Sequence, residues 1–168
     1  MTGATVAALA VLASYLLGGF CAAYYVVRIA CSADIRALGS GTAGARNAGR
    51  VLGASGFLLT LLLDAAKGAL AVLVTARLAP GVWPATLALI AVVAGHIWPA
   101  QLGFRGGKGL ATLLGGLIAW VPLAARGADP AMLPSLAVAT VLPAMTLWAH
   151  RENLAAARAR RAERGATR

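Results

Sequence analysis

A short segment in the second half of the chain gathers groups that could hold a phosphate. Residues 105–109 read Arg-Gly-Gly-Lys-Gly and lie between two apolar runs. Glycines let the backbone turn so that successive N–H groups face one concavity, which suits an oxyanion. Lys108 would add a positive charge, and a helix beginning near Leu110 would direct its N-terminal dipole to the same place. The spacing excludes the GxxxxGK[ST] nucleotide-binding loop, because Leu102 and Gly109 occupy two of its fixed positions.

Two other polar segments carry groups of the same kind. Residues 39–50 contain four glycines, a serine, an asparagine and two arginines. Backbone N–H groups, a hydroxyl and guanidinium groups all bind oxyanions, although a flexible, positively charged loop is the competing interpretation. The third segment, 150–153, reads His-Arg-Glu-Asn and follows the last apolar run. Taken together, the three segments favour a membrane enzyme that acts on phosphorylated substrates.

Three further polar residues belong to the apolar runs themselves. His96 lies near the end of the run that precedes the glycines. A histidine in a membrane segment is a functional candidate, and a helix-packing histidine bonded to backbone is the alternative. Asp64 and Lys67 are three residues apart, so they share one helix face and can pair. We expect this pair to support the structure or the site rather than to act directly in catalysis.

The composition is that of a membrane protein. The 168 residues are 60% hydrophobic and 12% charged, whereas soluble domains carry about 25% charged residues. The net charge of +10 comes from cations in the gaps between apolar runs, which indicates membrane topology rather than a nucleic-acid partner. Cys21 and Cys31 form no metal-binding or redox motif, and five acidic residues are too few for a carboxylate-rich site. We therefore expect neither a metal nor a cofactor.

The lengths of the apolar runs predict an all-α, polytopic transmembrane helical bundle of about five spans. The expected spans lie near 5–28, 51–76, 82–102, 109–125 and 130–150. Twelve Lys or Arg residues lie in three alternate segments and two in the opposite gaps. The positive-inside rule then places the N-terminus outside and the C-terminus in the cytoplasm. The expected organisation is one integral-membrane domain, 1–168, in which 151–168 is a basic cytoplasmic tail and a short interfacial helix.

The polar segments resemble the motifs of the bacterial acyl-phosphate-dependent glycerol-3-phosphate acyltransferases, the PlsY family. The first motif, like SGNxGATNxxR, corresponds to 40–50, with Thr42 in place of its first Asn and Arg46 in place of its Thr. The second, like GHxxPxxxxFxGGKGxAT, is matched at every fixed position of 95–112. The third, HREN, is matched at its four positions, and an LDxxKG pattern stands at 63–68. The chain resembles a short, diverged member of this family.

The resemblance implies a reaction and a set of site residues. An acyl group would pass from acyl phosphate to the 1-hydroxyl of glycerol 3-phosphate, giving lysophosphatidate and phosphate for phospholipid biosynthesis. The enzyme would be a multi-pass protein of the bacterial inner membrane, with its active site facing the cytoplasm and a phosphate acyltransferase as possible partner. The implied catalytic residues are Ser40, Arg50, Lys108, His150 and Asn153. The implied substrate-binding residues are Gly41, Gly44, Asn47, His96, Gly106, Gly107, Gly109 and Glu152.

Two questions stay open at the level of sequence. The hydroxyl proton could pass to His96, to His150 or to a phosphate oxygen of the substrate. The chain could also be a catalytically impaired relative that binds phosphate or lipid, or a small anion transporter. A transporter predicts charges inside several of the expected spans. Asp64 and Lys67 both lie within a single span, which argues against a transporter.

Overall fold

The structure, a computed structural model, describes residues 2–126 and 132–151. Within these two ranges every regular element is a helix. In chain order the elements are α1 (Gly3–Gly19), α2 (Ala22–Cys31), η1 (Ile35–Ala37), α3 (Ala45–Leu78), α4 (Val82–Ile97), η2 (Ala100–Leu102), α5 (Leu110–Ala125) and α6 (Met132–Ala149).

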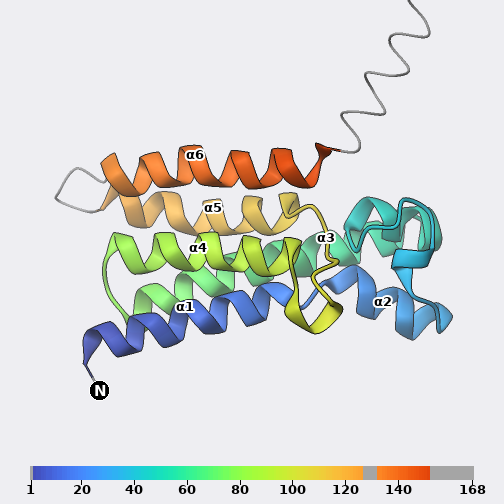
Figure 1. Cartoon of the computed structure of the whole chain (residues 1–168), viewed down its shortest axis with the longest axis horizontal. Coiled ribbons are helices and arrows are strands. Elements are labelled where there is room, and N and C mark those ends of the chain that lie inside the picture. The colour runs from blue at the N-terminus through green and yellow to red at the C-terminus, as the bar shows by residue number, and fades with distance from the viewer. Residues whose placement is uncertain (1, 127–131, 152–168) are drawn as a thin grey trace, which may run out of the picture.

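Five helices form a bundle. Figure 1 shows α1, α3, α4, α5 and α6 side by side, with α2 and the first turns of α3 extending beyond one end of the others. In the described part of the chain, Gly3–Cys31, Ala45–Leu78 and Val82–Leu102 are long and apolar enough to cross a membrane. The apolar helices α5 and Pro134–Ala149 are shorter. The bounds of α5 and α6 match the expected spans near 109–125 and 130–150.

The first apolar run breaks into two helices instead of forming the continuous helix expected near 5–28. The break lies at Phe20 and Cys21, between α1 and α2. It frees the carbonyl groups of Gly18 and Phe20, and both accept hydrogen bonds from the ammonium of Lys67, at 3.0 and 2.6 Å. Because lipid offers no hydrogen-bonding groups, a lysine in a membrane segment has to find its acceptors in the protein.

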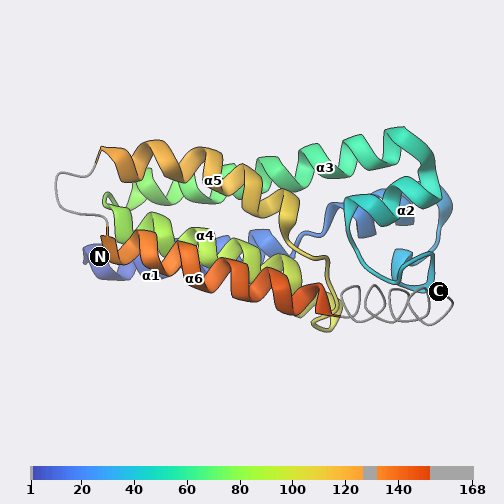
Figure 2. The ribbon, with the colours of Figure 1, turned by 90° about the horizontal axis from the view of Figure 1, so that it is seen from above.

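The third helix starts earlier than expected and bends near its beginning. The sequence predicted a loop up to residue 50, but α3 is helical from Ala45 onward. Gly53 has φ 71° and ψ −161°, a conformation that side chains disfavour, and it separates the first turns from the long remainder. Figure 2 shows the sharp bend at this end of α3. The bend turns the first polar segment back toward the bundle, where Gly49 lies against Phe57.

Glycines allow two pairs of helices to pack backbone against backbone. A Cβ at Gly115 of α5 would overlap the carbonyl oxygen of Ala65 in α3, and a Cβ at Gly95 of α4 would overlap that of Tyr15 in α1. Small residues at such crossings are typical of membrane helices, whose association depends on close van der Waals packing. Apolar side chains fill the space between these pairs, among them Leu89, Val92, Val93, Trp120 and Leu142.

We expect Gly115→Ala to destabilise the bundle, because the atoms its Cβ would meet belong to backbone and cannot rotate away. The Cβ would lie 2.5 Å from the carbonyl carbon and 2.8 Å from the Cα of Ala65. Overpacking costs about 1–3 kcal/mol, which should lower the thermal midpoint in detergent by roughly 2–10 °C. Gly3→Ala is the matched control, since nothing lies within 4 Å of its Cβ position. Equal midpoints for both variants would contradict this helix contact.

Candidate active site

The three polar segments meet at one end of the bundle, as the sequence predicted. They surround a cavity of about 220 Å³. Its polar wall takes side chains from every segment and one carboxylate from α3, namely Thr42, Arg46, Asn47, Asp64, His96, Lys108 and His150. Phe57 and Leu61 of α3 give it an apolar side. The first cavity therefore combines cationic groups with a surface suited to a hydrocarbon chain.

A second cavity, of about 340 Å³, shares part of its lining with the first. Thr42 and Lys108 line both spaces. The remaining wall of the second cavity is more polar and includes Ser40, Gly41, Trp98, Arg105, Gly106, Gly107, Trp148 and Arg151. Two adjacent spaces with a shared cation suit two phosphorylated substrates that must react with each other.

The glycines of the second segment serve close packing. The N–H groups of Gly106 and Gly107 donate to the carbonyls of Ile97 and His96, at 3.3 and 3.0 Å. Gly106 in turn accepts from Ala43 N–H at 3.2 Å, which joins the first and second segments. These two N–H groups are therefore occupied by backbone carbonyls, and the substrate-binding role of Gly106, Gly107 and Gly109 stays a prediction. Lys108 and the first residues of α5 line the first cavity, and their binding of an anion stays a prediction.

A buried cluster of polar groups adjoins the first cavity, and two of its members, Asp64 and His96, line that cavity. Lys67 Nζ is 2.8 Å from Asp64 Oδ1 and 2.7 Å from His96 Nδ1. The three side chains are between 1% and 4% exposed. Asp64 Oδ1 also accepts from the N–H of Ala22, the first residue of α2, at 3.3 Å. The predicted Asp64–Lys67 pair is confirmed, whereas its link to His96 was not foreseen.

Comparison with known proteins agrees with this architecture. Residues 8–128 match the sequence model of the family described as glycerol-3-phosphate acyltransferase. The chain belongs to the glycerol-3-phosphate acyltransferase family. It is similar to glycerol-3-phosphate acyltransferase 1 of Desulfitobacterium hafniense (51% identity over 76% of this chain and 63% of the relative). A relative from Halalkalibacterium halodurans is 50% identical over 70% of this chain and 58% of its own length. The chain thus spans about three fifths of the curated relatives that it matches.

Solved structures of the acyltransferase family have the same fold. The crystal structure of PlsY (YgiH), an integral membrane glycerol 3-phosphate acyltransferase, in its glycerol 3-phosphate form superposes with a TM-score of 0.77. Identity is 28%, and the alignment covers 88% of this chain and 90% of that one. Its lysophosphatidic acid form gives a TM-score of 0.74 at 27% identity, over 88% and 89% of the two chains. The predicted family and the all-α membrane fold are confirmed, while the number of spans and their orientation stay predictions.

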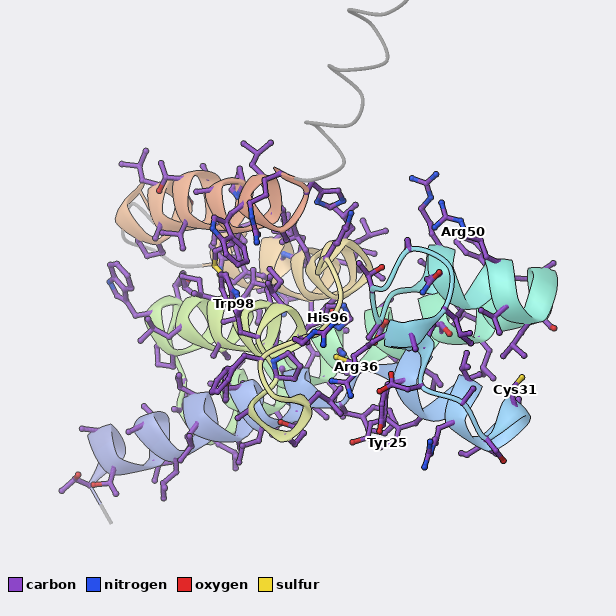
Figure 3. All side chains as sticks on the ribbon, turned by 45° about the vertical axis from the view of Figure 1, so that its right-hand side comes forward. Tyr25, Cys31, Arg36, Arg50, His96 and Trp98 are labelled. Atoms are coloured by element: carbon purple, nitrogen blue, oxygen red, sulfur yellow. The ribbon has the colours of Figure 1, made fainter. Side chains whose placement is uncertain are left out.

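In this member of the family the two arginines of the first segment take different places. Arg46, which stands where the family motif has Thr, lines the first cavity. Arg50, the arginine of the motif, is exposed and lines neither cavity. Figure 3 shows Arg50 on the outer side of the first turns of α3, apart from His96 in the interior. The catalytic role implied for Arg50 therefore stays a prediction without a contact to support it.

Asn47 organises the loop that carries Ser40. Its amide nitrogen donates to the carbonyls of Ile35, Leu38 and Thr42, at 2.9 to 3.1 Å. Its amide oxygen accepts from the N–H of Ser40 at 2.9 Å. Both ends of the amide are thus bonded within the loop, so Asn47 supports the loop, and its predicted substrate contact stays a prediction. Ser40 Oγ lies 3.1 Å from Thr42 Oγ1, so these hydroxyls face each other beside Lys108.

Sequence reasoning missed Arg36, which links the loop before the first segment to η2. Its guanidinium group bonds Asp34, with a shortest distance of 2.7 Å, and donates to the carbonyl of Leu102 at 2.6 Å. Its guanidinium carbon also lies 5.1 Å from the ring centroid of Tyr24. The hydrogen bonds from Arg36 hold the pKa of Asp34 below its ordinary value. Asp34 therefore stays ionised, and the ion pair intact, until the pH falls below the ordinary pKa of an aspartate. The sequence signal that could have indicated this ion pair is the Asp-x-Arg spacing of residues 34–36.

The third segment reaches both cavities. His150 lines the first, and its Nδ1 lies 2.8 Å from the carbonyl oxygen of Thr146. Arg151 lines the second, with its guanidinium carbon 3.8 Å from the ring centroid of Trp148. The site predictions for Glu152 and Asn153, and the predicted tail helix, lie outside the described residues.

Proposed function

We propose that this protein transfers an acyl group from acyl phosphate to the 1-hydroxyl of glycerol 3-phosphate, giving lysophosphatidate and phosphate. One observation carries the proposal: three segments far apart in sequence build two adjoining cavities that share Lys108. A binding protein for one anion needs one such space, whereas group transfer between two phosphorylated molecules needs two. The family, and the glycerol 3-phosphate and lysophosphatidic acid forms of PlsY, support this substrate class.

The reaction asks mainly for positioning and for stabilisation of negative charge. The 1-hydroxyl oxygen bonds to the acyl carbonyl carbon, the bond from that carbon to the phosphate oxygen breaks, and phosphate leaves. The hydroxyl proton passes to a base or to a phosphate oxygen. Acyl phosphate is already activated, so placing the hydroxyl against the carbonyl supplies much of the rate. Lys108 and Arg46 line the space where the negative charge would develop, which favours the transition state.

The two cavities suggest how the substrates divide. The apolar side of the first cavity, at Phe57 and Leu61, suits the chain of acyl phosphate. The second cavity has two arginines and the glycine segment in its wall, and it suits the small, polar glycerol 3-phosphate. Lys108 then lies between the two phosphates. Attack would occur across the shared wall formed by Thr42 and Lys108.

The cellular setting is part of the same proposal. We place the protein in the bacterial inner membrane as one domain, with the cavities on the cytoplasmic side. The excess of cations in the segments that carry the site supports this orientation. We propose acyl phosphate, rather than coenzyme A thioester, as donor, supplied by a phosphate acyltransferase.

A turnover assay tests the proposal. Purified protein in detergent, given palmitoyl phosphate and glycerol 3-phosphate, should release phosphate and form lysophosphatidate detectable by mass spectrometry. Omission of glycerol 3-phosphate measures simple hydrolysis, and palmitoyl-coenzyme A in place of palmitoyl phosphate should give no product. Folded protein that binds glycerol 3-phosphate but forms no lysophosphatidate would refute the activity and identify an impaired relative.

A further inference from the structure

The contacts of Lys67 determine which nitrogen of His96 carries the ring proton. Three oxygens surround the Lys67 nitrogen, those of Gly18 at 3.0 Å, Phe20 at 2.6 Å and Asp64 at 2.8 Å. These oxygens and a fourth neighbour share the three protons of the ammonium, which has no lone pair to offer. The fourth neighbour is His96 Nδ1 at 2.7 Å. An Nδ1–H would direct its proton at the ammonium, so Nδ1 must be the unprotonated nitrogen and Nε2 must carry the proton.

The distance to Asp64 supports the same tautomer. If Nδ1 carried a proton, the carboxylate would be its natural acceptor, but Asp64 Oδ1 lies 3.7 Å from Nδ1. That separation is too long for a hydrogen bond and is a full 1 Å longer than the contact with Lys67. The ring is therefore oriented by the lysine rather than by the carboxylate.

The other ring nitrogen of His96, Nε2, lies on the side of the candidate active site. A Cβ at Gly107 would overlap Nε2, so this edge of the imidazole lies against the glycine segment, and His96 lines the first cavity. In the described part of the chain the hydrogen bonds of the ring involve Nδ1, and Nε2 has no protein acceptor. Because His96 lines the first cavity, an Nε2–H can donate a hydrogen bond to a ligand bound there.

We propose that Lys67 is a positioning residue that holds His96 as a neutral Nε2–H donor facing the first cavity, where it would donate to an oxygen of the bound substrate. For the identity of that ligand we rely on the proposed function. His150 is arranged in the opposite way, because its Nδ1 faces the carbonyl of Thr146 at 2.8 Å and must donate to it. The two histidines of one cavity thus present a donor and an acceptor.

Nitrogen NMR tests the tautomers without any substrate. The chain has two histidines, so protein labelled with ¹⁵N-histidine gives two ring systems, and His150→Asn assigns them. At about pH 8.5, above the ordinary histidine pKa, His96 should show protonated Nε2 and His150 protonated Nδ1. Lys67→Met removes the ammonium at similar length and should shift His96 toward the Nδ1–H tautomer. The matched control is Thr75→Val, which removes a buried hydroxyl contact on the same helix and should leave His96 unchanged.

Two results would overturn the proposal. One is an Nδ1–H or doubly protonated His96 in the wild type, and the other is an unchanged tautomer in folded Lys67→Met. If Lys67→Met does not fold, variants at position 96 decide whether His96 acts as a hydrogen-bond donor. His96→Gln keeps an N–H donor and His96→Ala does not, so a donor role predicts kcat/KM at least about tenfold higher for Gln. A base role predicts equal losses for both. Absence of turnover in the wild type would refute the proposed function while leaving the NMR result to decide the tautomer.

Discussion

Lys108→Ala should lower kcat/KM for glycerol 3-phosphate by about 100-fold, which corresponds to about 3 kcal/mol of lost transition-state stabilisation. Lys108 lines both cavities, and its ammonium is the cationic group that they share. Its removal leaves phosphate oxygens of both substrates with less positive charge in a partly apolar space. The loss should appear in KM for glycerol 3-phosphate and in kcat, as measured by phosphate release over a range of both substrates.

Two companion variants separate this effect from a general loss of surface charge. Lys108→Arg keeps the charge and should retain more activity than Lys108→Ala, although the wider guanidinium will not fit the shared wall equally well. Arg28→Ala removes an exposed cation of α2 that lines neither cavity, and it should leave turnover unchanged. Activity of Lys108→Ala within about threefold of the wild type would contradict the shared-wall arrangement, since removal of a single charge-assisted contact alone costs more.

Gly107→Ala should abolish most activity while the bundle stays folded. A Cβ at this position would overlap His96 Nε2, and it would lie 2.8 Å from the carbonyl oxygen of Ala43 and 2.9 Å from His96 Cε1. Neither neighbour can move freely, because His96 is held by Lys67 and the Ala43 segment is bonded to Gly106. The glycine segment must therefore shift, and a displacement of about 1 Å at a reacting site costs about 100-fold in rate.

The control for Gly107→Ala lies in the same segment. Gly103 has φ +61° and nothing within 4 Å of its Cβ position. Asparagine tolerates this left-handed conformation, so Gly103→Asn should keep turnover near the wild-type level. Phosphate release and the thermal midpoint in detergent should be measured for both variants. A fully active Gly107→Ala would show that the second segment does not pack against His96 as described.

The helical architecture could be predicted because a bilayer restricts the solutions open to the chain. Lipid offers no hydrogen-bonding groups, so apolar runs of sufficient length form helices. The run 109–125 became α5, Leu110–Ala125, for this reason. The break at Phe20 could not be predicted, because it depends on Lys67, which lies 47 residues further along the chain. The early start of α3 was missed because a glycine-rich, polar sequence is also typical of a loop.

The sequence by itself determined which segments form the site and what class of ligand suits them, since residue type decides the charge and hydrogen-bonding capacity that each segment brings. Only the tertiary structure decided how individual groups are used. It placed Arg46 rather than Arg50 beside the first cavity, turned Asn47 inward to its own loop, and set Lys67 against one nitrogen of His96. These choices depend on distances between helices that are far apart along the chain, and close packing sets those distances to within about an ångström.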